Sequence, residues 1–162
     1  TIIYENHPDL VRELAEKMMQ HDVKPEIEVF DLSMLYQALR MADEGLLKKP
    51  LHVQFVLGVK NAMPCIRQAF DFMVEEVQRL APEATWVAAG IGRHQLEVNR
   101  WCLERGGHCR TGLEDNIRWD ETRLAASNAE LVGRVAELCG RYGRHPASAA
   151  EARKILGLRP AV

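Results

Sequence analysis

Residues 25–31 read PEIEVFD, a short run in which charged and apolar side chains alternate. Three further short apolar runs follow it, LHVQFVL at residues 51–57, TWVAAGI at residues 85–91 and HCRTGLE at residues 108–114. Runs of this length that are rich in Val, Ile, Phe and Trp are typical of strands. We therefore predict four strands over these four ranges.

Longer stretches with the 3.6-residue periodicity of helices separate the four runs. Strictly alternating helices and strands predict parallel strands joined by right-handed crossovers. Either an open doubly wound sheet or part of a (β/α)8 barrel has this arrangement. The helices are expected before residue 25, over about 33–45, 64–82 and 95–105, and after the last strand behind two Ser-x-x-Glu capping boxes, Ser127 with Glu130 and Ser148 with Glu151.

The two faces of the first strand favour the barrel. Ile27 and Val29 alternate with Glu26 and Glu28, and the last run alternates in the same way around Arg110. A central strand of an open sheet that has helices on both sides should be apolar on both faces. A barrel strand with polar residues in the lumen fits the pattern better. A structural ion pair between Arg110 and either glutamate explains the same pattern.

Composition limits the classes of partner. The chain has 162 residues and a net charge of -2. It therefore lacks the excess positive charge expected of a protein that binds nucleic acid or an anionic membrane. No window approaches the ~18 apolar residues of a membrane span, and the first residues lack a signal-peptide pattern. The four cysteines form no CxxC pair, which argues against a disulfide framework. We expect one soluble, cytoplasmic domain over residues 1–162, without an internal boundary.

The residues that close the strands carry the candidate chemistry, because active sites of parallel α/β folds lie at the carboxyl ends of the strands. Glu114 and Asp115 close the last run, and Arg110 precedes Glu114 by four residues. A carboxylate there suits a divalent metal and an arginine suits an anionic substrate, although residues 115–116 also fit an ordinary turn. Gly90 and Gly92 would allow an anion to approach the backbone amides closely. Alternatively, the two glycines serve only a tight turn between strand and helix.

One longer pattern makes the sequence recognisable. Residues 106–116 read GGHCRTGLEDN, and with PEIEVFD, GIGRHQ at 90–95, SNAELV at 127–132 and EARKILGL at 151–158 the chain resembles the β-keto acid cleavage enzyme family. The resemblance covers essentially the whole chain in order. It implies a zinc-dependent (β/α)8 TIM barrel, of which this chain supplies about the last four βα units.

The resemblance also implies an activity and roles for particular residues. Such an enzyme is a transferase that condenses a β-keto acid with acetyl-CoA and releases acetoacetate and a new acyl-CoA. The family's zinc ligand maps onto Glu114, and its catalytic arginine and aspartate map onto Arg110 and Asp115. A glutamate of residues 25–31 contacts the variable part of the keto acid, either Glu28, which we favour, or Glu26. The other expected substrate-binding residues are Arg93, Gln95 and Asn116.

The sequence departs from the family in what it lacks. It contains no His-x-His pair, which supplies the family's other zinc ligands, and the family barrel is roughly twice as long. We therefore expect a carboxyl-terminal half that needs the amino-terminal half of a longer enzyme, which as a whole forms a homo-oligomer. The alternative is a non-catalytic half-barrel that pairs its open sheet edges with a partner or with itself. The sequence leaves open which β-keto acid is used.

Overall fold

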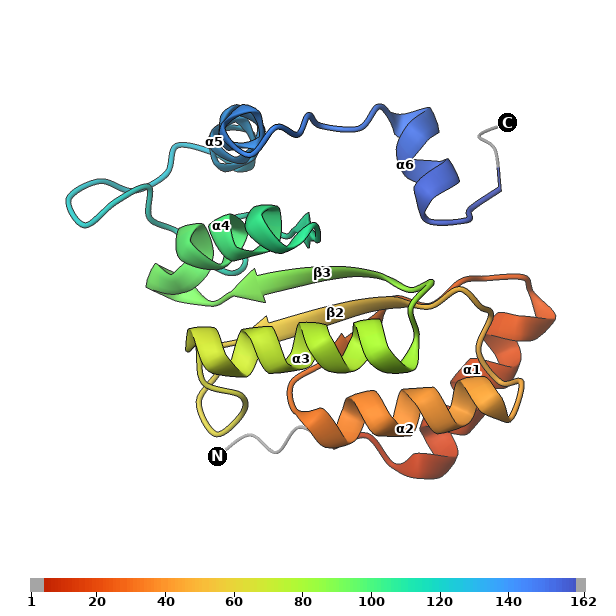
Figure 1. The fold of residues 1–162 in the computed structure, drawn as a ribbon. Coiled ribbons are helices and arrows are strands. Elements are labelled where there is room, and N and C mark those ends of the chain that lie inside the picture. The colour runs from red at the N-terminus through yellow and green to blue at the C-terminus, as the bar shows by residue number, and fades with distance from the viewer. Residues whose placement is uncertain (1–4, 160–162) are drawn as a thin grey trace.

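The structure is a computed structural model that describes residues 5–159. The predicted domain also includes residues 1–4 and 160–162, which lie outside the described residues. The elements follow one another as α1 (Pro8–Gln20), β1 (Ile27–Val29), α2 (Leu32–Asp43), β2 (His52–Leu57), α3 (Arg67–Leu80), β3 (Thr85–Gly90), the short helix η1 (Gly92–His94), α4 (Gln95–Arg105), β4 (His108–Cys109), α5 (Asn128–Arg141) and α6 (Ala149–Ile155) (Figure 1).

The four strands form one parallel sheet in the order β1-β2-β3-β4. This order confirms the predicted α/β class with helical crossovers. The register aligns Glu28 with Gln54, and Gln54 with Val87. Because side chains alternate between the faces of a strand, residues in register share a face. Glu28 and Gln54 therefore project from the same face of the sheet.

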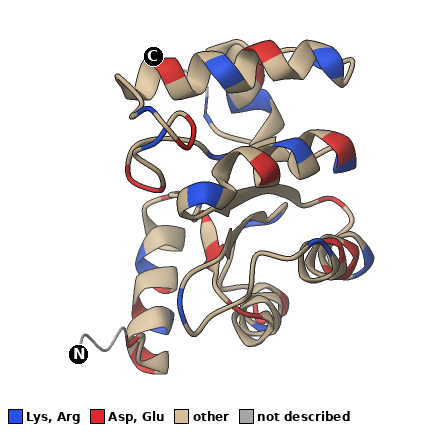
Figure 2. Ribbon diagram, turned by 90° about the vertical axis from the view of Figure 1, so that its left-hand side faces the viewer, with Lys and Arg blue, Asp and Glu red and all other residues tan. Residues whose placement is uncertain are grey.

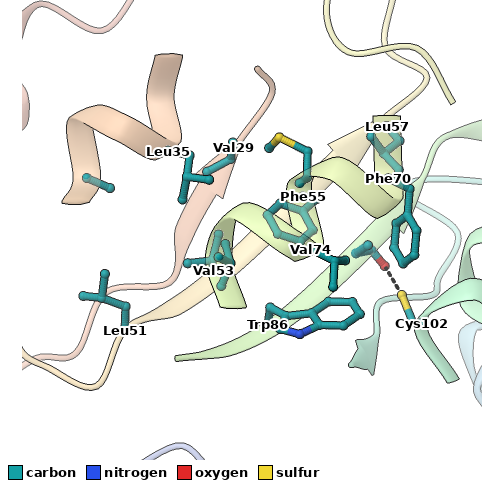
Figure 3. Packing of buried hydrophobic residues seen from close by; sticks show 14 of the residues in the cluster. Val29, Leu35, Leu51, Val53, Phe55, Leu57, Phe70, Val74, Trp86 and Cys102 are labelled. Carbon is teal, nitrogen blue, oxygen red and sulfur yellow. Dashed lines mark hydrogen bonds between the residues drawn. The ribbon is translucent and has the colours of Figure 1, made fainter. Parts of the chain in front are cut away.

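The opposite face of the sheet carries the hydrophobic core. Val29, Val53 and Phe55 pack there against side chains of α2, α3 and α4, and Figure 3 shows Phe55 beside the ring of Trp86. The ring centroids of these two residues are 5.9 Å apart, a normal aromatic packing distance. The predicted apolar face of the first strand is thus confirmed. The helices cover one face of the sheet and leave the polar face for the site.

The last strand is shorter than predicted. β4 ends at Cys109, whereas the sequence pattern predicts a strand over residues 108–114. The Arg110 amide still donates to the Ala88 carbonyl at 3.3 Å, but the chain then turns. Gly112 has a φ of 156°, and the Asn116 amide donates to the Gly112 carbonyl at 3.2 Å. This turn lifts the GLEDN segment away from the sheet.

The helix ends confirm most of the predicted signals. α4 ends at Arg105, and the C-cap residue Gly106 has a φ of 83°, the left-handed conformation that glycine adopts readily. The second capping box, Ser148 with Glu151, is complete. The first box is only half formed, because Ser127 accepts from the Glu130 amide while the Glu130 carboxylate accepts from the Ala126 amide. The Glu130 carboxylate therefore bonds the Ala126 amide, one residue before the Ser127 amide that a complete capping box uses.

Charge and hydropathy agree with the composition. Figure 2, which looks along the strands, shows basic and acidic residues interspersed on the helices. Among residues 5–159, no helix is both long and apolar enough to cross a bilayer. All four cysteines are free thiols.

Gly107 provides a test of the core. A Cβ at this position would lie 2.1 Å from the Trp86 ring, so we expect Gly107→Ala to destabilise the protein by roughly 1–3 kcal/mol or more through overpacking. Gly133→Ala is the matched control, because nothing lies within 4 Å of a Cβ there and alanine favours the interior of α5 by ~0.5–1 kcal/mol. Urea unfolding measures both. Equal stability of the two variants would contradict this packing.

Candidate active site

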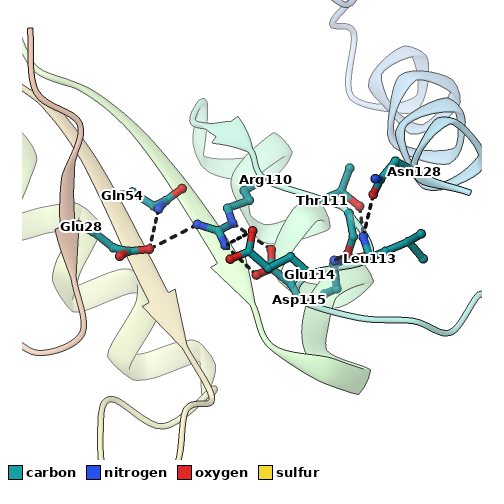
Figure 4. A network of polar contacts seen from close by, with 10 residues as sticks. Glu28, Gln54, Arg110, Thr111, Leu113, Glu114, Asp115 and Asn128 are labelled. Carbon is teal, nitrogen blue, oxygen red and sulfur yellow. Dashed lines mark hydrogen bonds and ion pairs between the residues drawn. The ribbon is translucent and has the colours of Figure 1, made fainter. Parts of the chain in front are cut away.

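Arg110 follows the edge strand β4 and lies at the centre of a network of polar contacts (Figure 4). Its Nε and Nη2 each donate to one carboxylate oxygen of Asp115 at 2.8 Å, the bidentate geometry that suits a guanidinium. Its Nη1 donates to Glu28 Oε1 at 3.2 Å, and its Nη2 lies 3.6 Å from the Glu114 carboxylate. One arginine thus meets three carboxylates.

The Arg110–Glu28 pair joins the two edges of the sheet. Glu28 belongs to β1 and Arg110 follows β4, so the pair spans β2 and β3, a backbone separation of roughly 14 Å at ordinary strand spacing. Gln54 on β2 supports it by donating its amide to Glu28 Oε1 at 3.0 Å. The open choice between the two glutamates is settled for this contact, because Glu26 pairs with His52 at 3.5 Å.

A clamped turn carries the carboxylates Glu114 and Asp115. Gln95, fully buried at the start of α4, donates its amide to the Gly112 carbonyl at 2.9 Å and accepts from the Thr111 hydroxyl at 3.0 Å. Asn128, the first residue of α5, accepts from the Leu113 amide at 2.8 Å. The turn is therefore held by the first residues of two helices.

The two carboxylates that follow point in different directions. The Asp115 side chain is 4% exposed and faces Arg110, whereas the Glu114 side chain is 87% exposed. The amide of Gly92 donates to the Asp115 carbonyl at 2.7 Å, which ties the β3–α4 loop to the turn. The Asp115 carboxylate is thus buried against Arg110, whereas the Glu114 carboxylate lies largely in solvent.

The remaining predicted site residues lie at the edge of this arrangement. Arg93 is exposed in η1, and no hydrogen bond or ion pair involves its guanidinium within residues 5–159. Asn116 uses its side chain within its own loop, donating to the Arg118 carbonyl and accepting from the Arg118 amide. Contacts of Arg93, Gln95 and Asn116 with a substrate stay predictions.

Two contributors to the site did not stand out in the sequence. Gln54 sits on the polar face of β2, and the alternation of LHVQFVL carries that signal. Asn128 follows the N-cap Ser127 in a motif that matched the family without a role. Its contact with Leu113 depends on how α5 returns to the turn, which no local pattern encodes.

Electrostatics differ between the two ends of the polar face. The Asp115 carboxylate raises the pKa of Arg110, so this guanidinium stays charged and can hold an anion. At the amino-terminal end, the hydrogen bond from His52 lowers the pKa of Glu26. Burial, aided by the charges of His52 and Arg144, lowers the pKa of His108. The guanidinium at the carboxyl ends of the strands therefore keeps its positive charge among three carboxylates, while the histidine at the opposite end is held towards its neutral form.

The donor set of this chain alone does not fit a zinc ion. Among the described residues, no three His, Cys, Asp or Glu side chains approach one another closely enough to hold a metal. Zinc in proteins takes about three or four such ligands. Glu114 is a single exposed carboxylate, so a metal here requires ligands from outside the chain.

The sequence as a whole matches known proteins. A family model described as beta-keto acid cleavage enzyme matches residues 1–158. The 3-oxoadipate:acetyl-CoA acetyltransferase of Cupriavidus necator is 57% identical over 158 residues, which are 98% of this chain and 56% of that protein. The 3-keto-5-aminohexanoate cleavage enzyme of Fusobacterium nucleatum subsp. nucleatum is 41% identical over 158 residues, 97% of this chain and 56% of that protein. The chain spans about half the length of these curated relatives.

Solved structures agree on the fold. The apo structure of ObcA superposes with a TM-score of 0.78 at 20% identity, covering 96% of this chain and 41% of ObcA. A ternary complex of ObcA with a C4-CoA adduct and oxalate gives the same TM-score at 22% identity, over 96% of this chain and 42% of that protein. The superposition confirms the predicted half-barrel architecture.

The depressed pKa of His108 predicts a pH-dependent stability. Its folded pKa lies below the ordinary value of 6.5, so the unfolded chain binds the proton more tightly and this contribution to stability is lost as pH falls below about 6.5. We expect the loss of the urea midpoint between pH 7.5 and 5.5 to be smaller in His108→Gln than in the parent. His145→Gln, at an exposed position, should leave the loss unchanged. Identical pH dependence in all three proteins would refute the assignment.

Proposed function

The chain belongs to the beta-keto acid cleavage enzyme family, and from this premise we propose that it is the carboxyl-terminal half of a (β/α)8 enzyme. The enzyme transfers the acyl group of a β-keto acid to the CoA of acetyl-CoA and releases acetoacetate. The half described here supplies a substrate-binding arginine, a general base and one metal ligand. The remaining ligands come from a preceding half of the same protein.

The Arg110–Asp115 pair is the observation that carries this proposal. A β-keto acid presents a carboxylate, and the always-charged guanidinium of Arg110 is the group in the described site suited to pair with it. Both Asp115 oxygens already accept from Arg110. A substrate carboxylate that takes one of these donors frees one Asp115 oxygen, so binding of substrate activates the base.

The reaction then consists of a proton transfer, a carbon–carbon bond formation that expels the CoA thiolate, and a carbon–carbon bond cleavage in which the thiolate is the nucleophile. Asp115 removes the proton between the carboxylate and the keto group, and the resulting enolate carbon attacks the acetyl thioester. The CoA thiolate leaves and attacks the keto carbon, whose bond to the former enolate carbon breaks. The acetoacetate enolate recovers the proton from Asp115, so the base is unchanged at the end.

The name of the 57% identical relative specifies 3-oxoadipate, which supports a dicarboxylic β-keto acid as the substrate class. A dicarboxylate needs a second cation, and Arg93 is exposed and unpaired in the described part of the chain. The negative charge of Glu28 does not repel such a substrate strongly, because the Glu28 carboxylate is already paired with Arg110 and hydrogen-bonded to Gln54. We propose 3-oxoadipate as substrate, which by carbon balance gives acetoacetate and succinyl-CoA. Arg93 binds its distal carboxylate, and Glu28 borders the variable part of the keto acid.

Glu114 is proposed as the one metal ligand from this half. Its exposed carboxylate follows the 111–113 turn beside Arg110, and a divalent metal held there with ligands from the rest of the protein would polarise carbonyl oxygens. Cytoplasmic location and homo-oligomerisation stay predictions from the sequence.

The role of Asp115 is tested in the longer protein that contains this chain. We expect Asp115→Asn to lower kcat for 3-oxoadipate with acetyl-CoA by roughly 10²–10⁴-fold, because the amide cannot take up the proton. The measurement is acetoacetate release under saturating substrate. Asp120→Asn, in the exposed loop that follows, should keep the parent rate. An active Asp115→Asn enzyme would remove Asp115 as the base.

Metal content tests Glu114 separately. Glu114→Gln should lose both bound zinc, measured by elemental analysis after gel filtration, and acetoacetate formation, because an amide is a poor zinc ligand. The exposed Glu121→Gln serves as control and should retain both. If Glu114→Gln keeps full zinc and activity, Glu114 is not a ligand. If the parent protein converts no β-keto acid, the non-catalytic half-barrel becomes the better explanation.

A further inference from the structure

We propose that Asn128 and Gln95 are positioning residues that fix the turn at residues 111–113 and thereby the geometry of the Arg110–Asp115 pair. The inference deepens the proposed function and rests on it. Neither side chain is required to touch the substrate for this role. Each acts through the backbone that joins Arg110 to Asp115.

Gln95 holds the inner side of the turn. Its side chain is fully buried, and both ends of its amide are used, the Nε2 on the Gly112 carbonyl and the Oε1 on the Thr111 hydroxyl. A buried amide that lost these partners would carry unsatisfied donors and acceptors, which costs free energy. The turn is therefore bound firmly to the first turn of α4.

Asn128 holds the outer side of the turn. Its Oδ1 accepts from the Leu113 amide at 2.8 Å and lies 3.0 Å from the position of a Cβ at Gly112. A side chain at residue 112 would therefore press on the Asn128 amide, and the Gly112 φ of 156° is a conformation that residues other than glycine rarely adopt. Figure 4 shows Asn128 reaching from α5 to Leu113.

The clamped segment lies between the two catalytic side chains along the chain. Arg110 precedes it and Asp115 follows it, and the two side chains close the loop with paired hydrogen bonds of 2.8 Å. Beyond the turn, the Asp115 backbone is also held by the Gly92 amide. A displacement of ~1 Å in such a pair can lower a rate by about 10²-fold. The clamp therefore controls catalysis without entering the reaction.

Asn128 is the better residue to test, because it is exposed and its replacement leaves the core intact. In the longer protein, Asn128→Ala removes the acceptor for the Leu113 amide. Asn128→Asp keeps an acceptor oxygen and places a negative charge at a helix start, where it is favourable. Ala129→Gly in the same turn of α5 is the control, because it weakens the helix without touching Leu113.

We expect Asn128→Ala to lower kcat about tenfold while KM for acetyl-CoA changes less than twofold. Asn128→Asp should restore kcat to within about twofold of the parent, and Ala129→Gly should leave kcat unchanged despite its lower stability. Hydrogen exchange should show the Leu113 amide exchanging ~10-fold faster in Asn128→Ala alone. If Ala129→Gly lowers kcat by the same factor, or if Asn128→Asp does not restore kcat, the lost activity comes from lower stability of the protein. Either result would overturn the positioning role of Asn128.

The exchange measurement separates the clamp from the proposed reaction. If the parent protein converts no β-keto acid, the proposed function fails, yet the Leu113 exchange rate still reports whether Asn128 holds the turn. If Leu113 exchanges at the parent rate in Asn128→Ala, the clamp is wrong whatever the activity.

Discussion

The contact of Arg110 with Glu28 and Asp115 is the constraint around which the polar face is arranged. It connects the first strand of the sheet with the loop after the last one, residues 82 positions apart. Both edge strands must therefore be in register before the guanidinium can reach its partners. Because the opposite face is packed with apolar side chains against helices, the sheet is held in that register independently of the site.

The two acidic residues of the site differ in burial and in their contacts. Asp115 is buried and paired, whereas Glu114, one residue earlier, is almost fully exposed. A buried carboxylate is stable only with charge-assisted hydrogen bonds, which Arg110 provides. An exposed carboxylate has no such requirement and can bind a group supplied by another part of the protein. The exposed Glu114 carboxylate is the basis on which we propose that further metal ligands come from another part of a longer protein.

Local sequence patterns predicted which segments form helices and strands better than they predicted where each helix or strand ends. The end of α4 just before Gly106 followed directly from the conformational freedom of glycine. The strand predicted over residues 108–114 stopped at Cys109, because alternation continues through the sequence of the turn although the backbone leaves the sheet. Alternation reports which side chains are polar, and it cannot report where the backbone hydrogen bonds end. The half-formed box at Ser127 has the same origin, since the Glu130 carboxylate selected a neighbouring amide.

The sequence by itself determined the alternation of helices and parallel strands, the apolar and polar faces of the first strand, and the motif that carries family membership. These depend on periods of two and 3.6 residues and on local backbone preferences, which neighbouring residues encode. Only the tertiary structure decided that Glu28 rather than Glu26 meets Arg110, and that Gln95 and Asn128 clamp the turn. These contacts depend on strand register and on where the helices return to the sheet. Both are set by residues far apart in the chain, so no local pattern predicts them.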